Sequence, residues 1–189
     1  MTLTQWPAIV AVLGLSGTGK SEAARWLAES RGYHRVYFGG IVVDEVHRRG
    51  LAGPEQERLV REELRRDHGM GAMAVLSLAA IREHVDRDEP VVIDGLYSAA
   101  EREILVEHFG DALVTLAVHA PRWLRKQRLA QRATRPLTSA EVDARDEFEV
   151  RNLDKAVPIV EADLHVVNDS DLDALFAAVE TTLSSRPVA

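Results

Sequence analysis

Three glycines, a lysine and a serine lie close together near the start of the chain, in the stretch "GLSGTGKS" at residues 14–21. Gly14, Gly19, Lys20 and Ser21 occupy the specified positions of the G-x-x-x-x-G-K-[ST] pattern. Glycines let backbone N–H groups turn inward around phosphate oxygens, and the N-terminus of a following helix adds donors and a favourable dipole. We therefore expect Lys20 to reach the β- and γ-phosphates of a nucleoside triphosphate, and Ser21 to offer its hydroxyl to Mg²⁺.

The spacing of the glycines separates this loop from other nucleotide-binding patterns. A dinucleotide site requires G-x-G-x-x-G, whereas Gly14, Gly17 and Gly19 are three and two positions apart. The "NLDK" segment at residues 152–155 does not fit an N-K-x-D guanine motif. The alternative of a glycine turn without a ligand is disfavoured because all four specified positions coincide. The candidate phosphate-binding residues are Gly14, Ser16, Gly17, Thr18, Gly19, Lys20 and Ser21.

An acidic residue follows a second apolar run, in the segment "EPVVIDGLYS", where Asp94 comes directly after residues 91–93. A carboxylate at the end of a strand beside the phosphate loop can hold the water shell of Mg²⁺ or act as a base. The alternative is an aspartate that only caps the next helix. We expect Asp94 to be catalytic and, with Ser21, to face the metal ion.

Residues 121–140 contain six basic residues and no acidic one. Arg125, Arg128, Arg132 and Arg135 are spaced three, four and three apart, which predicts that they share one face of a helix. Such a row of arginines can also be no more than the solvent-exposed face of a helix. Guanidinium groups, however, match phosphate oxygens and stabilise the charge that spreads over a phosphoryl group during transfer. We expect at least two of these arginines to clamp the ligand.

The elements that would position these residues alternate along the chain. Short apolar runs indicate strands buried on both faces of a parallel sheet. They occupy residues 8–13, 91–93, 113–118 and 164–167, with a weaker one at 34–38. Helical periodicity covers residues 21–30, 54–67, 72–85, 99–109 and 171–183, and Thr138 with Glu141 predicts a capping box. The alternation indicates an α/β domain with right-handed crossovers.

Composition limits the other classes of function. The chain of 189 residues has no cysteine, which excludes disulfides, thiolate zinc sites and cysteine nucleophiles. Its seven histidines show no metal-binding spacing, and its net charge of −7 argues against a nucleic acid polymer as the main partner. No segment approaches the ~20 apolar residues of a membrane span, so we expect a cytoplasmic protein whose partner is a small anionic molecule.

With these elements placed, the chain resembles the P-loop kinases of the adenylate kinase and dephospho-coenzyme A kinase group. "VVIDGLYSAAE" is similar to their D-G-x-x-R segment, and "RLAQRATRPLTSAEVDAR" with "ADLHVVNDSDLDALFAAV" is similar to the lid and C-terminal elements of dephospho-coenzyme A kinases. "FGGIVVDEVHRRGL" and "DHGMGAMA" look closest to an uncharacterised nucleotide kinase-like branch of small archaeal and bacterial proteins.

The resemblance implies a three-layer P-loop NTPase fold of the α/β class, with a five-stranded parallel sheet and helices on both faces. The chain would be a single domain over residues 1–189, with a short arginine-bearing lid at about residues 122–140. Residues 14–21 would bind the phosphates of ATP with Mg²⁺. Arg128, Arg132 and Arg135 would be lid arginines, the first two catalytic, and the loop at Asn168 would border the adenine.

The chain departs from that group on the acceptor side. Gly40 stands where relatives place an aspartate, Val43 where they place an arginine, and Tyr97 and Ser98 where the D-G-x-x-R arginine would be. Asp44 is the nearest substitute for the missing aspartate. Those arginines normally hold a phosphate of the acceptor, so the donor half of the site is expected to be intact and the acceptor half altered.

These observations predict an ATP- and Mg²⁺-dependent phosphotransferase that transfers the γ-phosphate to a small-molecule acceptor. Two alternatives stay open: a dephospho-coenzyme A kinase, and a nucleotide-binding regulatory protein with little transfer activity. The sequence does not distinguish ATP from GTP, and it specifies neither the acceptor nor the oligomeric state.

Overall fold

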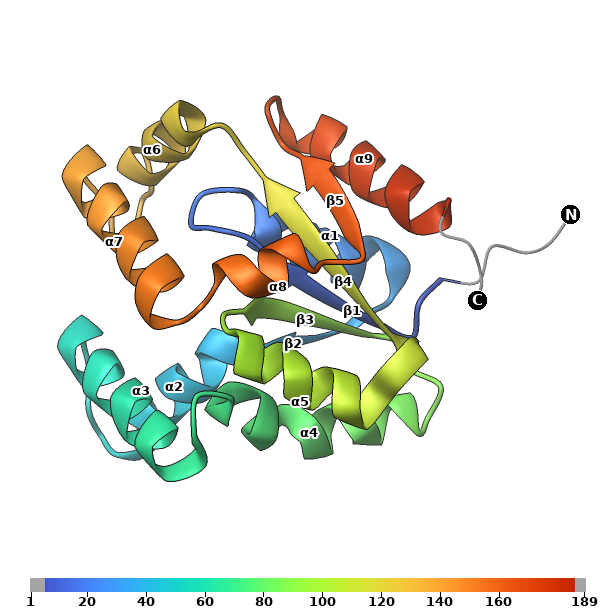
Figure 1. The fold of residues 1–189 in the computed structure, drawn as a ribbon, viewed down its shortest axis with the longest axis horizontal. Helices are drawn as coiled ribbons and strands as arrows, with labels where there is room; N and C mark the ends of the chain where they lie inside the picture. Colours follow the sequence, from blue (N-terminus) through green and yellow to red (C-terminus); the bar gives the residue numbers. More distant parts are fainter. Residues whose placement is uncertain (1–5, 186–189) are drawn as a thin grey trace, which may run out of the picture.

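The computed structural model describes residues 6–185, so residues 1–5 and 186–189 of the expected single domain lie outside the described part. Five parallel strands form one sheet in the order β2-β3-β1-β4-β5 (Figure 1). The strands are β1 (Ile9–Leu13), β2 (His34–Tyr37), β3 (Val91–Leu96), β4 (Leu113–His119) and β5 (Leu164–Val167). The five-stranded parallel sheet predicted from the apolar runs is therefore confirmed. The run at 91–93 continues three residues further, to Leu96.

Burial on both faces of the sheet explains why the central strands β1, β3 and β4 contain few polar residues. The expectation of the same burial for β2 and β5 is wrong: both are partly exposed, because they lie at the edges of the sheet. All five residues of β1 are buried, and neighbours along the strand face opposite sides. Ile9, Ala11 and Leu13 join one hydrophobic cluster, whereas Val10 and Val12 join the other. A strand enclosed in this way needs an apolar residue at every position.

Helices cover both faces. On one side, α1 (Lys20–Arg31) and α9 (Leu172–Ser184) pack on the sheet. On the other side lie α2 (Phe38–Arg48), α3 (Pro54–His68), α4 (Ala72–Val85) and α5 (Ala99–Phe109), followed by the 3₁₀ turn Gly110–Ala112. All the predicted helical segments are present, and the capping box of Thr138 and Glu141 forms at the start of α7 (Ser139–Asn152). No helix within residues 6–185 is both long and apolar enough to span a membrane.

The carboxyl ends of the strands point towards α3, α6 (Arg122–Ala130) and α7, which gather at one end of the sheet (Figure 1). A short helix, α8 (Ala156–Val160), connects α7 to β5. Ligands of open α/β sheets bind at this end of the strands. The segment at 122–140 thus comprises α6, a turn and the start of α7.

The prediction that four arginines share one helical face is wrong for two of them. α6 ends at Ala130, so Arg125 and Arg128 lie on the helix, whereas Arg132 and Arg135 lie in the turn that follows. Pro136 explains part of this, because a proline disfavours helical backbone in the residue before it. Arg135 has a φ of 54°, in the left-handed region.

Candidate functional site

The glycine loop between β1 and α1 is shaped by positions that accept no side chain. Gly14 has a φ of 142°, and a Cβ there would lie 2.4 Å from the carbonyl oxygen of Val118. Gly19 has a φ of 96°, and a Cβ there would lie 2.3 Å from the Asn168 amide nitrogen. Only glycine combines this backbone with this close approach. The loop therefore brings the start of α1, with its free N–H groups, to the carboxyl end of β1.

Lys20 is buried at the first position of α1. Its pKa is lowered to about 7, mainly because burial disfavours the charged ammonium and also because the Lys155 ammonium repels it; Glu149 and Asp94 act in the opposite direction. The side chain is thus surrounded by charges contributed by β3, α7 and the segment before α8. An anion bound in the loop would favour the protonated form of Lys20.

Asp94 is fully buried within β3, two residues before the end of the strand, and its carboxylate is shared by two partners. The Ser21 hydroxyl donates to Oδ1 over 3.0 Å, and Arg35 of β2 donates to Oδ2 through Nε at 3.1 Å and through a second guanidinium nitrogen. Ser21 and Asp94 are therefore brought together as predicted. Arg35 was not among the predicted residues; a charged residue directly before Val36, inside a predicted strand, was the signal that could have identified it.

A cavity of about 300 Å³ opens over the start of α1. Seven of the predicted site residues line it, together with Glu22 and Leu172: Gly17, Gly19, Lys20, Ser21, Arg128, Arg132 and Asn168. Arg132 reaches the cavity from the turn after α6. The cavity is open to solvent at the side where the turn lies exposed.

Asn168 and Arg128 connect the C-terminal end of the sheet to the phosphate loop. The buried Asn168 amide donates to the Thr18 carbonyl oxygen over 2.8 Å, and Arg128 donates to the Asn168 side chain and to the carbonyl oxygens of Asn168 and Ser170. The Thr18 hydroxyl donates to the Leu15 carbonyl oxygen. These contacts fix the loop from outside and place Asn168 next to Gly19.

Arg125 connects parts of the structure to one another. It is buried, donates to the Ser16 carbonyl oxygen over 3.1 Å and forms a two-point ion pair with Asp146 of α7. α6 and α7 are therefore joined to each other and to the phosphate loop through one guanidinium group.

Two predicted residues lie apart from the cavity. Arg135 pairs with Glu57 of α3, across 78 positions of sequence, and does not line the cavity. Asp44, the weak candidate for an acceptor-side base, is an exposed residue of α2. The helix explains this position. Val42 and Val46 are on the face of α2 that packs on the core, so Asp44, midway between them, lies on the opposite face.

On the acceptor side, where this chain lacks the arginines of the kinases it resembles, the structure has aromatic rings and a buried ion pair. The Tyr37 ring lies over the first turn of α2, and a Cβ at Gly39 would approach its ring to 2.5 Å. Lys155 is fully buried, with Nζ 2.6 Å from Glu149 and 4.5 Å from the centre of the Tyr97 ring. Glu149 also accepts from Arg145 Nε over 2.9 Å. Glu149 and Arg145 were missed because nothing in the periodicity of α7 separates them from a solvated face, and Lys155, in the segment between α7 and α8, carried no motif.

The residues at the loop fit a magnesium ion that arrives with a nucleotide. Ser21 and Asp94 are oxygen donors that already meet, and no cluster of three or more His, Cys, Asp or Glu side chains suited to a metal occurs within residues 6–185. Mg²⁺ typically takes one or two protein oxygens and completes its shell with substrate phosphates and water. This donor set matches that arrangement.

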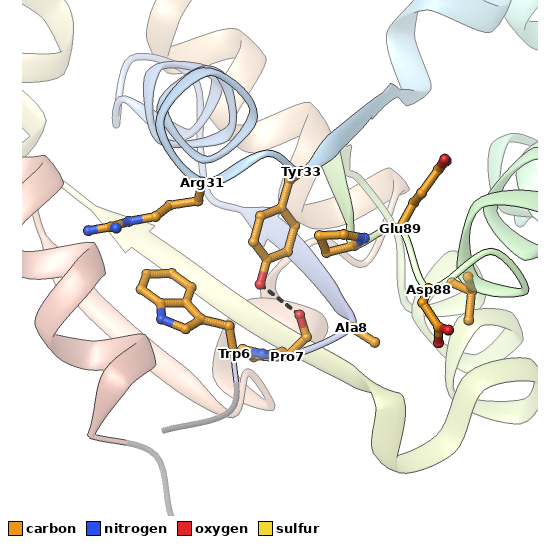
Figure 2. Close-up of a pocket in the computed structure, with 9 residues that line it drawn as sticks. Trp6, Pro7, Ala8, Arg31, Tyr33, Asp88 and Glu89 are labelled. Atoms are coloured by element: carbon orange, nitrogen blue, oxygen red, sulfur yellow. Dashed lines mark hydrogen bonds between the residues drawn. The ribbon is translucent and has the colours of Figure 1, made fainter. Parts of the chain in front are cut away.

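A second, larger cavity of about 580 Å³ lies at the opposite end of the sheet. Figure 2 shows its lining, in which the Tyr33 hydroxyl donates to the Pro7 carbonyl oxygen over 2.6 Å and the Arg31 guanidinium lies near the Trp6 ring. It is formed by residues that precede β1, β2 and β3, on the amino side of the strands. No glycine loop or helix N-terminus borders it, so its chemistry differs from that of the phosphate loop.

Comparisons with known proteins identify the family of the chain and proteins of the same fold. The family model described as an AAA domain matches residues 10–155. A UPF0200 protein of Halobacterium salinarum is 34% identical over 179 residues, which cover 94% of this chain and 93% of the relative.

Two solved structures have the same fold at low sequence identity. A gluconokinase from Sinorhizobium meliloti 1021 superposes with a TM-score of 0.61 at 20% identity, covering 95% of this chain and 93% of its own. A shikimate kinase from Bacteroides thetaiotaomicron gives a TM-score of 0.57 at 14% identity, covering 93% of both chains. The fold of the chain is thus the one that these two kinases share.

Proposed function

Because the chain belongs to the AAA-domain family and to the UPF0200 proteins, and has a P-loop kinase-like fold, we propose that it is an ATP-dependent phosphotransferase acting on a small molecule. The observation that carries the proposal is the meeting of Lys20, Ser21 and Asp94 at the carboxyl edge of β1 and β3. A carboxylate in this position can hold the water shell of Mg²⁺ or accept a proton from the acceptor.

Each residue has a role that follows from its position. The backbone N–H groups of residues 14–21 would surround the phosphates, and Lys20 would place its charge on the β- and γ-phosphates. Arg128 and Arg132, which line the cavity, would stabilise the charge on the transferred group. Asn168, next to Gly19, would border the base. Arg135 would join this group only if the turn left Glu57.

Magnesium, held by Ser21 and Asp94 with the nucleotide, would supply charge neutralisation at the phosphates. Asp94 has one oxygen directed to Ser21 and the other to Arg35. In the transfer, an acceptor hydroxyl oxygen forms a bond to the γ-phosphorus while the bond to the β-phosphate oxygen breaks, and the hydroxyl proton leaves the acceptor. The buried Asp94 carboxylate would orient that hydroxyl or accept its proton.

The observations favour more than one class of acceptor. The resemblance in the lid and C-terminal elements favours nucleotide acceptors and dephospho-coenzyme A. The structural neighbours are named a gluconokinase and a shikimate kinase, which favours hydroxy acids. The phosphate loop is compatible with each of them, because it contacts the donor and not the acceptor.

The proposal is tested with an acceptor panel incubated with Mg-ATP, in which ADP release and phosphorylated product are both measured. The panel contains the nucleoside monophosphates, dephospho-coenzyme A, gluconate and shikimate. The expected result is turnover of one acceptor class, lost by about a hundredfold or more in Lys20→Ala, since the lysine stabilises the transferred charge. Lys126→Ala is the control, because that lysine pairs with Asp143 outside the cavity.

Binding of ATP with no product on any acceptor would contradict the proposal and leave the regulatory alternative. Turnover that survives in Lys20→Ala would also contradict it, since the loop would then not be the transfer site.

A further inference from the structure

Three hydrogen bonds within residues 6–185 end on the Asp94 carboxylate, and two of them come from Arg35. Arg35 donates to Oδ2 through Nε at 3.1 Å and through a terminal guanidinium nitrogen, whereas the Ser21 hydroxyl donates to Oδ1 over 3.0 Å. An ionised carboxylate has about four lone-pair positions, shared equally by its two oxygens. Those of Oδ2 are therefore occupied by Arg35, and the position that stays open is on Oδ1.

The register of β2 and β3 explains why Arg35 reaches this carboxylate. Arg35 lies opposite Val92, and Tyr37 lies opposite Asp94. Residues two apart in a strand face the same side of the sheet, so these four residues share one face. Val92 belongs to the hydrophobic cluster to which α1 contributes, and α1 also carries Ser21. Arg35 thus extends diagonally towards the carboxyl end of the sheet and meets the Asp94 oxygen that Ser21 does not contact.

An aromatic ring supports the Arg35 guanidinium. The central carbon of that group lies 5.2 Å from the centre of the Tyr37 ring, within the range of a cation–π contact. The ring lies against the first turn of α2, where a Cβ at Gly39 would be 2.5 Å from it and a Cβ at Gly40 would be 3.3 Å from it. A side chain at position 40, such as the aspartate of the kinases that the chain resembles, would compete with the ring for this space. The two glycines therefore leave room for the ring that contacts Arg35.

Asp94 is fully buried, whereas the Arg35 side chain is partly exposed. A buried carboxylate needs a partner that compensates its charge, and removing that partner is costly. The Ser21 hydroxyl is neutral, so Arg35 is the group that donates to Asp94 with a compensating positive charge. We propose that Arg35 is a positioning residue for phosphoryl transfer, which occupies Oδ2 of Asp94 and so directs the carboxylate to act through Oδ1. This inference rests on the proposed function and names the oxygen that would orient the acceptor hydroxyl or accept its proton.

The first test separates the positioning of Asp94 from nucleotide binding. Arg35→Met removes the cation, and Arg35 is not one of the residues that line the cavity over the start of α1. With the acceptor that the panel identifies, kcat should fall about tenfold or more while KM for Mg-ATP stays within about twofold, because a misplaced carboxylate affects the transition state and not the bound nucleotide. Arg35→Lys keeps a charged donor for Oδ2, so its kcat should lie between those of the wild type and Arg35→Met.

Arg31 offers a matched control at the opposite end of the sheet. Like Arg35, it pairs with a carboxylate, that of Glu180, and its central guanidinium carbon lies 5.2 Å from the centre of an aromatic ring, that of Trp6. The two arginine side chains are also similarly exposed, at 37% for Arg31 and 32% for Arg35. Arg31→Met should therefore lose comparable contacts and leave kcat unchanged. A similar fall of kcat in Arg31→Met would show that the loss does not depend on Asp94, contrary to the inference.

A second variant changes the support of Arg35 without altering Arg35 or Asp94. Gly39→Ala places a Cβ where the Tyr37 ring lies, so the ring has to move, whereas alanine by itself is favoured over glycine in a helix. In the free protein, NMR should show about tenfold faster exchange of the Arg35 Nε hydrogen with water, because its hydrogen bond to Asp94 opens more often. With the acceptor present, kcat should fall about threefold or more. In a Tyr37→Ala background, Gly39→Ala should change neither quantity, since the ring is absent.

Equal kcat in wild type and Arg35→Met would overturn the inference, and so would a defect that lies only in KM for Mg-ATP. If Arg35→Met does not fold, Gly39→Ala decides: faster exchange of the Arg35 Nε hydrogen with unchanged kcat overturns the positioning role, and unchanged exchange shows that Tyr37 does not support Arg35. Failure of the proposed function gives a different result. The wild type would then transfer phosphate to no acceptor of the panel, and slow exchange at Arg35 would assign its contact with Asp94 a structural role only.

Discussion

Lys20 is the residue whose charge depends most on what the site contains. In the free protein its pKa is about 7, because the ammonium is buried and Lys155 lies nearby. Phosphates bound in the loop would compensate both effects and return the pKa towards its usual 10.5. Binding therefore requires a protonated lysine that is only partly present at neutral pH.

Nucleotide binding should consequently take up protons. Since the pKa rises on binding, affinity for Mg-ATP is highest below pH 7 and falls, by up to tenfold per pH unit, as the pH rises above 7. Titration calorimetry at pH 8 in buffers of different ionisation enthalpy should show uptake of nearly one proton. In Lys20→Ala the uptake should disappear, and uptake that persists in this variant would assign the proton to another group.

The residues of the phosphate loop were predictable because they are neighbours in the chain. Asp94 and Asn168, whose partners lie 73 and 150 positions away, were predicted from the strand before Asp94 and from the family resemblance. Gly14, Gly19 and Lys20 belong to one continuous loop, so their spacing alone predicted their joint position. Arg35 and Lys155 act through partners brought close by the sheet and by α7, and no local spacing records such pairing.

At the scale of elements, the sequence predicted which segments are helical better than it predicted where each helix begins and ends. The capping box at Thr138 was predicted and forms, whereas the one made by Ser98 and Glu101 at the start of α5 was not foreseen. The spacing of the four arginines predicted a helix that continued past Ala130, although Pro136, only a few residues later, disfavours a helix there. Spacing indicates a common helical face, but only the backbone shows where the helix stops.

Glu101, in the capping box at the start of α5, has a carboxyl group with a raised pKa. The pKa of Glu101 is raised from 4.5 to about 7, mainly by burial, although the backbone N–H groups of Tyr97 and Ser98 favour its charged form. A carboxyl group with a raised folded-state pKa favours folding while it is protonated. Its contribution is full below pH 4.5 and is lost as the pH rises through 7.

Glu101→Gln should remove this dependence, because the amide does not ionise and can still accept from the backbone. The free energy of unfolding of the wild type, relative to that of the variant, should fall by roughly 1–3 kcal/mol between pH 5 and pH 8. Urea unfolding of both proteins at the two pH values measures it. Glu103→Gln, an exposed residue of the same helix, should show no such change. A wild-type-to-variant difference that is independent of pH would mean that Glu101 titrates normally.

At the scale of the whole molecule, the fold followed from the pattern of buried runs. Five apolar segments separated by helices leave few topologies, and the order β2-β3-β1-β4-β5 places the phosphate loop on the central strand. The sequence predicted less well how the segments around the carboxyl end of the sheet are arranged. α3 and the turn after α6 meet through charges that are 78 positions apart in the chain.

The pair of Arg135 and Glu57 connects the two sides of the site. Glu57 on α3 has a side chain only 13% exposed, whereas Arg135 in the turn is 63% exposed, so the interaction is partly screened by solvent. Pairs of this kind contribute about 0.2–1 kcal/mol. That is too little to hold the fold together, but it is enough to bias a short turn between a docked and a released position.

Glu57→Gln should therefore release the turn while leaving global stability nearly unchanged. The Leu137 amide reports on the turn, because it donates to the Leu129 carbonyl oxygen and so protects its hydrogen while the turn is docked. Hydrogen exchange at Leu137 should become up to about fivefold faster, the factor corresponding to ~1 kcal/mol. Glu55→Gln is the matched control, since Glu55 pairs only with Arg58 within α3. Equal exchange rates at Leu137 in wild type and Glu57→Gln would show that the turn is held by its own backbone, and that α3 and the arginine-bearing segment move independently.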